Sequence, residues 1–301
     1  MTSKITLFCI VLFISIQQVT AQTCTYKNDE GEKHLCGRFE ISDLENDTTY
    51  NKWYVSNYNE FDPALKDTSW KKNLQKVNVD IFMGTWCGDS RNWLPKFVKL
   101  WDELGLKRSQ LTFTALYDSD IEGKYKQGPN GEEKGLDIHR VPVFLFKRDG
   151  KEIGRIVESP ATDMVTDVAQ IALGYPSQPN YRAATYIMNL LNTQSMDSIN
   201  AHINDHFYEI YHLVGKVNEL NTLGYVYMDS DLDRASFVFM LNTYLYKHNP
   251  NVYDSYAEVL LKMGYEDKAL TYYKKVLELE PKNENALEQV AMIEAKAENK
   301  E

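Results

Sequence analysis

Cysteine and basic residues are both scarce in this sequence. Four cysteines among 301 residues are too few for a small scaffold held together by disulfides. Lysine and arginine number 33 against 43 acidic residues, a net charge of −10 that argues against a protein binding nucleic acid or an anionic membrane surface. Glycine-rich phosphate loops, Gly-x-Ser-x-Gly elbows and paired-carboxylate motifs are also missing. We therefore expect no cofactor and no nucleic-acid partner.

The rest of the composition is that of an ordinary folded protein. Hydrophobic residues make up 43% of the chain and charged residues 25%, which excludes wholesale disorder. A length of 301 residues favours two domains, because a single core rarely grows beyond about 250 to 300 residues.

No hydrophobic run is long enough to span a membrane. The apolar segment Ile5–Ile16 would extend about 18 Å as a helix, whereas a bilayer core needs roughly 30 Å. It follows Lys4 and leads to Val19-Thr20-Ala21, the small-residue pattern of a signal peptidase site. Residues 1–21 are thus expected to be a signal peptide, which implies export to a periplasm or secretion. The alternative is a buried N-terminal helix.

Export makes the cysteine positions informative. Removing the signal peptide removes Cys9 and leaves Cys24, Cys36 and Cys87. In an oxidising compartment this odd number leaves at least one thiol unpaired within the chain, or paired elsewhere. Cys24 and Cys36 flank a short polar stretch that can turn back on itself, so a Cys24–Cys36 disulfide is favoured and Cys87 stays free.

A mixed pattern of strands and helices follows the N-terminal extension, residues 22–49. Strands are expected at 77–83 and 111–117, and a hairpin at 143–157 turning at Asp149-Gly150. Helices are expected at 90–104 and 161–173, and another is expected to begin at Pro63, because proline suits the first turn of a helix. This order describes a small mixed sheet flanked by helices.

Residues 176–180 are expected to be a linker, and residues 181–301 read as helical throughout. Ala235 and Ala269 lie 34 residues apart, as do Phe239 and Tyr273, and 34 residues is the tetratricopeptide period. Two repeats are expected, at about 219–250 and 251–284, with capping helices before them. A plain helical bundle is the alternative.

The stretch most informative for chemistry is Gly84-Thr85-Trp86-Cys87-Gly88-Asp89-Ser90, where a strand ends and a helix begins. A thiol at a helix N-terminus meets unpaired backbone N–H groups and the positive end of the helix dipole, which favour the nucleophilic thiolate. Val141-Pro142 directly precedes the hairpin, and proline at a strand start indicates an edge or a special turn.

These features resemble the thioredoxin superfamily over about residues 50–175. Trp86-Cys87-Gly88 matches the family's Trp-Cys-Gly, and Pro95 matches the proline within its active-site helix. Pro142 matches the cis-proline that faces the cysteine, and Gly150 the hairpin glycine beyond it.

The resemblance implies an α/β thioredoxin-like fold, with an all-α tetratricopeptide-like domain after it. It also implies a catalytic Cys87, with Val141 and Pro142 in the substrate groove. The full candidate motif comprises Thr85, Trp86, Cys87, Gly88, Asp89 and Ser90.

The departures from the family bear on activity. Ser90 stands where dithiol members have their second cysteine, so a mixed disulfide at Cys87 needs another thiol to resolve it. The buried aspartate of thioredoxin corresponds to Ile81, and Asp80 is expected on the opposite face of the sheet. Glu158 replaces a groove glycine. These differences count against an efficient general reductant.

Two functions remain open. One is thiol–disulfide exchange on client proteins, as an oxidoreductase or isomerase, with Ser90 able to hydrogen-bond the thiolate. The other is a scaffold without turnover, in which the repeats hold a protein partner and Cys87 only fills space. The helices either form an independent binding module or dock on the thioredoxin-like domain and close over Cys87.

A metal site is not expected. His202 and His206 lie four residues apart, which could place two ligands on one helical face. Nothing else completes a tetrahedral set.

The signal-peptide interpretation makes a direct prediction. Because Ala21 ends the small-residue pattern after the apolar run, the mature protein should begin at Gln22. N-terminal sequencing of the protein from the envelope or medium checks this, and retention of Met1 there would refute it.

Overall fold

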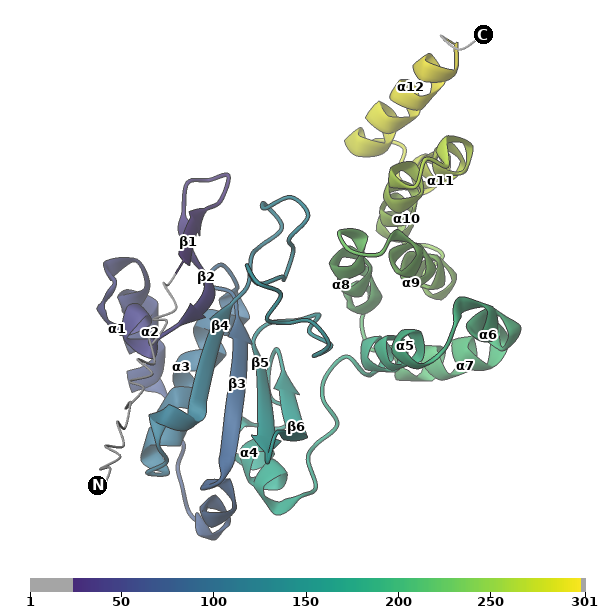
Figure 1. The fold of residues 1–301 in the computed structure, drawn as a ribbon. Coiled ribbons are helices and arrows are strands. Elements are labelled where there is room, and N and C mark those ends of the chain that lie inside the picture. Colours follow the sequence, from purple (N-terminus) through teal and green to yellow (C-terminus); the bar gives the residue numbers. More distant parts are fainter. Residues whose placement is uncertain (1–23, 299–301) are drawn as a thin grey trace, which may run out of the picture.

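A six-stranded mixed sheet forms the centre of the N-terminal part (Figure 1). The computed structural model describes residues 24–298. The strands run in the order β1-β2-β4-β3-β5-β6. They are β1 (Cys24–Lys27), β2 (Lys33–Phe39), β3 (Val77–Met83), β4 (Leu111–Ala115), β5 (Val143–Arg148) and β6 (Lys151–Val157). β3 and β4 are parallel, and the other neighbouring pairs are antiparallel.

Alternation of side chains gives the sheet two different faces. On one face the odd-numbered residues of β3 are buried in a core that also contains Phe97, Trp101, Phe144 and Phe146. Helices cover this face: α1 (Ile41–Asn46), α2 (Thr48–Glu60), α3 (Gly88–Glu103) and α4 (Met164–Leu173). Short 3-10 turns, η1 (Ser69–Leu74) and η2 (Arg108–Gln110), precede β3 and β4.

The opposite face is apolar over only half of its length. Near the end of β3 it buries Phe82, Val143, Leu145 and Val157. Toward the start of β3, Asn78 is exposed and Asp80 pairs with Lys147 at 2.7 Å. This division indicates that only the apolar half of this face is packed against other parts of the protein.

Part of that cover is the connection between β4 and β5, residues 116–142, which consists of turns and irregular backbone. Its apolar residues Leu116, Leu136, Ile138 and Val141 join the cluster on the sheet. Arg155 of β6 fixes it in place by donating from Nη1 to the carbonyl oxygens of Leu136, at 3.0 Å, and Asp137, at 3.4 Å.

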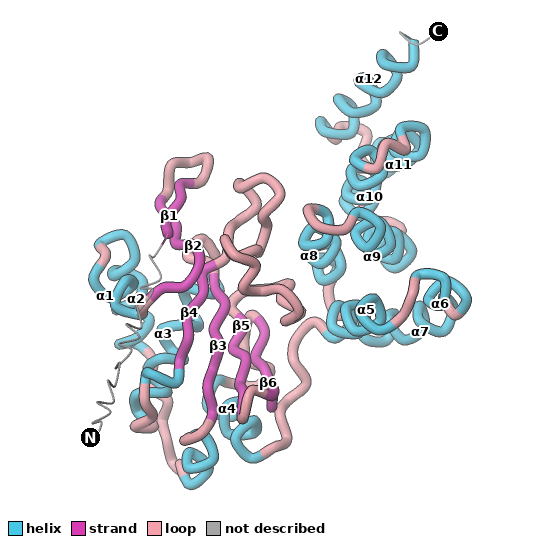
Figure 2. The backbone as a smooth tube through the Cα atoms, viewed as in Figure 1, coloured by secondary structure: helices cyan, strands magenta, loops and turns pink. Residues whose placement is uncertain are grey.

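The chain after the linker is helical (Figure 2). The helices are α5 (Arg182–Thr193), α6 (Met196–Ala201), α7 (Ile203–Leu213), α8 (Val217–Met228), α9 (Leu232–Leu245), α10 (Pro250–Lys262), α11 (Glu266–Leu279) and α12 (Glu284–Glu298). Consecutive helices pack in pairs, α8 with α9 and α10 with α11. Gly224 permits the first pairing, since a Cβ atom there would lie 2.4 Å from the Phe239 ring. The predicted fold class, a sheet with flanking helices followed by an all-helical region, is confirmed.

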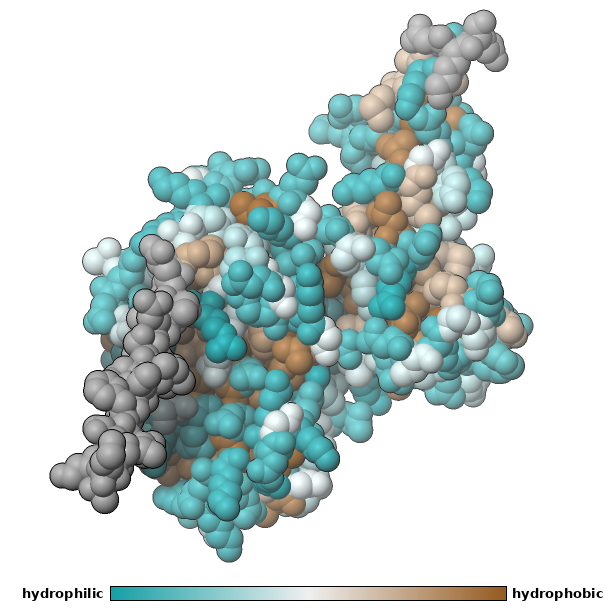
Figure 3. Space-filling view, viewed as in Figure 1, coloured by the Kyte–Doolittle hydropathy of each residue, from teal (hydrophilic) through white to brown (hydrophobic). Residues whose placement is uncertain are grey.

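One apolar cluster joins the two parts. It runs from the second sheet face through residues 116–142 to α5, α7, α8 and α9. Polar contacts lie beside it: Arg140 donates to the carbonyl oxygen of Asn218 at 2.8 Å, and Asn192 donates to Asp137 at 2.9 Å. In the space-filling view the visible surface is mainly hydrophilic, with a hydrophobic patch at the junction of the two parts (Figure 3). The helical region therefore shares a core with the sheet.

Two N-terminal features differ from the sequence-based expectations. β1 and β2 lie within 22–49, the predicted extension, and β2 pairs with β4, so the sheet begins before residue 50. The helix expected from Pro63 was wrong. Instead α2 begins after Asp47, whose side chain accepts a hydrogen bond from the N–H of Thr49 at 2.8 Å, and it ends at Glu60. Proline is also common just beyond helix ends, which is the position that Pro63 occupies.

The predicted signal peptide, residues 1–21, lies outside the described residues. Among the helices within residues 24–298, none is both long and apolar enough to cross a membrane.

The shared core predicts that residues 24–175 do not form a well-packed domain alone. Removing residues 181–301 exposes the apolar half of the second sheet face, including Phe82, Leu145 and Val157. We expect this fragment to bind a hydrophobic dye such as ANS and to aggregate, whereas the full chain does neither. A monomeric fragment that unfolds cooperatively without binding the dye would show that the sheet needs no helical cover.

Candidate functional site

Cys87 occupies the junction between β3 and α3. It is the N-cap residue of α3, with extended backbone angles, and its side chain is half-buried. Its Sγ donates to the carbonyl oxygen of Val141 at 3.3 Å, and the Val141-Pro142 peptide bond is cis. The structure thus brings Cys87 together with Val141 and Pro142, which follow it by more than fifty residues in the chain.

Trp86 covers the strand end beside the thiol. Its indole Nε1 donates to the carbonyl oxygen of Leu116 at 2.8 Å. A Cβ atom on Gly84 would lie 2.4 Å from the Trp86 ring, so only glycine allows the indole to lie against the backbone there.

Thr85 attaches the junction to β2. Its hydroxyl accepts a hydrogen bond from the N–H of Leu35 at 3.0 Å and lies 3.3 Å from Nδ1 of His34. On the other side, Nε of Arg91 donates to the carbonyl oxygen of Thr85 at 2.6 Å. Thr85 is 1% exposed, which makes it a buried support of the motif.

Ser90 is fully buried, and its hydroxyl accepts a hydrogen bond from the N–H of Gly84 at 3.2 Å. This contact ties the first turn of α3 to the end of β3. Ser90 therefore has a structural partner within the motif. Gly88 and Asp89, by contrast, are exposed in the first turn of α3.

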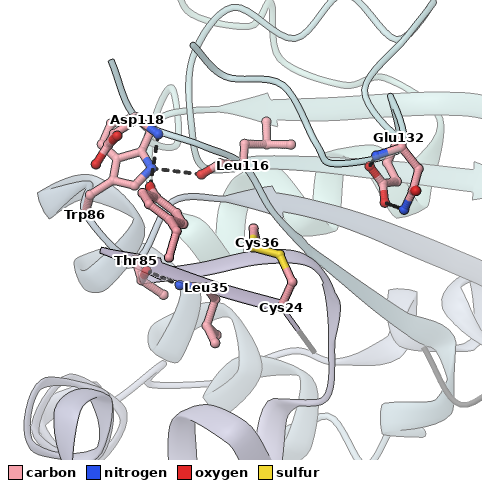
Figure 4. The surroundings of a disulfide bond; sticks show 10 residues. Cys24, Leu35, Cys36, Thr85, Trp86, Leu116, Asp118 and Glu132 are labelled. Atoms are coloured by element: carbon pink, nitrogen blue, oxygen red, sulfur yellow. Dashed lines mark hydrogen bonds between the residues drawn. A yellow bond between two sulfur atoms is a disulfide. The ribbon is translucent and has the colours of Figure 1, made fainter. Parts of the chain in front are cut away.

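The predicted disulfide joins Cys24 and Cys36 across β1 and β2 (Figure 4). The two residues are register partners with their Cα atoms 5.0 Å apart. Cys36 directly follows Leu35, the residue bonded to Thr85. Within residues 24–298, Cys87 is the free cysteine.

Asp80 and Ile81 lie as the strand alternation predicted. Ile81 is fully buried in the core beneath the helices. Asp80 points to the other face, where Lys147 neutralises it at 2.7 Å. No carboxylate of β3 therefore takes the place of the buried aspartate of thioredoxin.

A group of charged and aromatic residues near Cys87 was missed from the sequence. Lys126 is 4% exposed, and its Nζ donates to the Tyr125 hydroxyl at 2.6 Å. The Tyr125 and Trp86 rings lie 6.3 Å apart between centroids. Burial lowers the pKa of Lys126 to about 7, and it raises the pKa of Tyr125.

Arg140 and Glu158 lie on either side of the cis-proline in sequence and form an ion pair at 3.2 Å. The Arg140 guanidinium also stacks over the Tyr181 ring at 4.5 Å, and the Tyr181 hydroxyl donates to Glu158. The N–H of Glu158 donates to the carbonyl oxygen of Pro142 at 2.7 Å. Burial raises the pKa of Glu158, and the Arg140 charge opposes that increase. Glu158, at the position of the family's groove glycine, thus accepts a hydrogen bond from Tyr181 at the start of the helical region.

The two histidines considered as metal ligands have other surroundings. His202 is exposed at the start of α7, and Nδ1 of His206 lies 2.8 Å from the Tyr186 hydroxyl. The part of the chain that the structure describes contains no group of three or more His, Cys, Asp or Glu side chains able to hold a metal ion.

Comparison with known proteins agrees with this geometry. No family model matches the chain. Thioredoxin H9 of Arabidopsis thaliana is 30% identical over 104 residues, which cover 35% of this chain and 66% of that protein, just under two thirds. Thioredoxin H-type of Picea mariana is 28% identical over 110 residues, or 34% of this chain and 78% of the relative. The N-terminal part is thus similar in sequence to thioredoxins and has a thioredoxin-like fold.

The buried contact of Ser90 makes a stability prediction. Ser90→Ala leaves the buried N–H of Gly84 without its acceptor, so the free energy of unfolding should fall by about 1 to 3 kcal/mol. Ser56→Ala, an exposed change within α2, is the control and should alter that free energy by less than about 0.5 kcal/mol. Urea titration measures both, and equal effects would rule out a structural role for the Ser90 hydroxyl.

Proposed function

We propose that this protein exchanges thiols and disulfides with client proteins through Cys87. The observation that carries the proposal is the position of the thiol. A free cysteine caps the N-terminus of the sixteen-residue helix α3 and lies against the Val141 carbonyl beside a cis-proline. The first turn of a helix favours a thiolate, which is the form of cysteine that attacks disulfides.

The exchange begins when the Cys87 thiolate attacks one sulfur of a client disulfide. A bond forms between Cys87 and that sulfur, the client S–S bond breaks, and the other client sulfur leaves as a thiolate that takes up a proton. Ser90 has no sulfur to resolve this adduct, and Cys24 and Cys36 are bonded to each other. The adduct is therefore released by a second thiol of the client or by a small thiol, which suits isomerisation better than net reduction.

Export belongs to the same proposal. The N-terminal segment has the pattern of a signal peptide, and the Cys24–Cys36 bond fits an oxidising compartment such as a periplasm or the extracellular space. The protein would then meet clients whose disulfides persist.

A second candidate function is partner binding by the helical region, with α8 to α11 as two tetratricopeptide-like repeats. One observation favours it: a cavity of about 560 Å³ lies between the turns at 119–125 and the helices α8 and α10. Tyr125 lines this cavity, and its ring also lies 6.3 Å from that of Trp86, the residue before Cys87. The two functions are therefore compatible in one molecule.

The exchange proposal predicts a covalent adduct. Incubation of the purified chain with a peptide disulfide should add the mass of one peptide half to the wild-type protein, and Cys87→Ala should remain unmodified. Ser90→Cys supplies an attacking thiol at high effective concentration, so its adduct should decay at least tenfold faster.

Mass spectrometry under non-reducing conditions follows both steps. Cys87→Ser serves as the control for non-covalent binding. A wild-type protein that forms no adduct, or forms it equally in Cys87→Ala, would contradict the exchange function and leave partner binding as the remaining candidate.

A further inference from the structure

The segment that contains the cis-proline is fixed beside Cys87 at three consecutive residues. The carbonyl oxygen of Val141 accepts the hydrogen bond from Cys87 Sγ at 3.3 Å. The carbonyl oxygen of Pro142 accepts a hydrogen bond from the N–H of Glu158 at 2.7 Å. The Arg140 guanidinium pairs with the Glu158 carboxylate at 3.2 Å. Glu158 thus holds the segment through both its backbone and its side chain, on either side of the carbonyl that meets the thiol.

Strand pairing explains why Glu158 reaches this segment. Val143 and Val157 are register partners in the β5–β6 hairpin, so the residue before β5 lies opposite the residue after β6. Glu158 therefore faces Pro142. Its φ of 62° lies in the left-handed region, which residues with a Cβ atom rarely adopt. Glycine adopts this conformation readily, so contacts of the glutamate have to hold its backbone there.

Tyr181, at the start of the helical region, completes the arrangement. Its hydroxyl donates to the Glu158 carboxylate, and the Arg140 guanidinium lies 4.5 Å from the centroid of its ring. Arg140 also donates to the carbonyl oxygen of Asn218 in α8 at 2.8 Å. The side chains of Arg140 and Glu158 are only 11% and 18% exposed. Groups from the sheet and from the helices therefore enclose this ion pair together.

The ion pair is better explained by the geometry that it fixes than by its contribution to stability. Removing two charges from water costs about as much free energy as their attraction returns, so such a pair adds little to folding. It does restrict residues 140–142 to one position. A client disulfide that Cys87 attacks has to approach past Val141 and Pro142, and the attack requires the disulfide to be oriented toward the thiolate.

We propose that Glu158 is a positioning residue for the exchange reaction: together with Tyr181 it holds residues 140–142 where a client segment lies against Cys87. The inference rests on the function proposed above, and it gives the helical region a part in the site. A client segment that binds beside the thiol then meets a preformed surface, so less conformational freedom is lost on binding.

The test compares two reactions of Cys87 in the full chain. Adduct formation with a symmetric peptide disulfide depends on how the client lies, whereas alkylation by iodoacetamide, a small reagent, depends on thiolate content and exposure. Glu158→Gly removes the carboxylate but keeps the N–H that bonds Pro142, and glycine suits the φ of 62°. We expect this variant to fold, to form the adduct about tenfold more slowly, and to be alkylated within about threefold of the wild-type rate.

Three further variants show whether the carboxylate and its partner are responsible. Glu158→Gln keeps an oxygen that can accept from Tyr181, so its adduct should form within about twofold of the wild-type rate. Tyr181→Phe removes only the hydroxyl and keeps the ring beside Arg140, and it should slow adduct formation at least threefold, about half the effect of Glu158→Gly on a logarithmic scale. Tyr175→Phe, an exposed change after α4, should have no effect. If Glu158→Gly does not fold, Tyr181→Phe carries the same test.

The rates also separate this inference from the exchange function. Adduct formation at the wild-type rate in Glu158→Gly and Tyr181→Phe would overturn the inference and leave the exchange function in place. Faster adduct formation in either variant would overturn it as well, because the contacts would then restrict access to Cys87. Equal losses in adduct formation and alkylation would show a general disturbance of the thiol instead of a positioning role. A wild-type chain that forms no adduct would contradict both proposals.

Discussion

Burial of the second face of the sheet is the constraint on which the rest of the structure depends. The first face has four helices over it, but the connection from β4 to β5 contains no helix within residues 116–142. Burying each large apolar side chain contributes about 1.5 to 3 kcal/mol, so leaving Phe82, Leu145 and Val157 in water would cost several kcal/mol. Residues 116–142 and the helices after the linker pack against this face. The sheet and the helical region therefore share one hydrophobic core.

The same two segments, residues 116–142 and the helices, determine the environment of the candidate site. The half of the second face that is covered lies at the end of β3, where Cys87 begins α3. Trp86 and Cys87 pack at the edge of the shared cluster, so the thiol is half-buried and close to groups carried by residues 116–142. Lys126 and Arg140 come from that connection, and Arg140 also binds α8 through Asn218. Docking of the helices and the packing around Cys87 are thus linked through one irregular segment.

Local patterns in the sequence were sufficient for several of the elements but not for this arrangement. Alternation and helical spacing gave β3, α3, the β5–β6 hairpin and the opposite orientations of Asp80 and Ile81, because each depends on neighbours close in the chain. Lys126 could not be found in this way. It lies in a charged, glycine-containing stretch that has the composition of a solvated loop, and no short-range pattern predicts that it is buried. The helix at Thr48–Glu60 was missed because Pro63 suggested a helix start, whereas Asp47 provides the N-cap.

In the exchange reaction proposed above, a single thiol without a second cysteine in its motif favours one direction of chemistry over another. A helix N-terminus that favours a thiolate also makes that cysteine a better leaving group, because a sulfur leaves faster when its thiolate is more stable. Attack by Cys87 on a client disulfide and release of Cys87 from the adduct then both become faster. Ser90 provides no thiol that could form a disulfide with Cys87, so the cycle does not end with an oxidised protein. Such a site returns to its starting state only when the client itself supplies the second thiol, or when a small thiol does. The rearrangement of client disulfides proposed above is consistent with this symmetry, because it requires no net transfer of electrons to or from the protein.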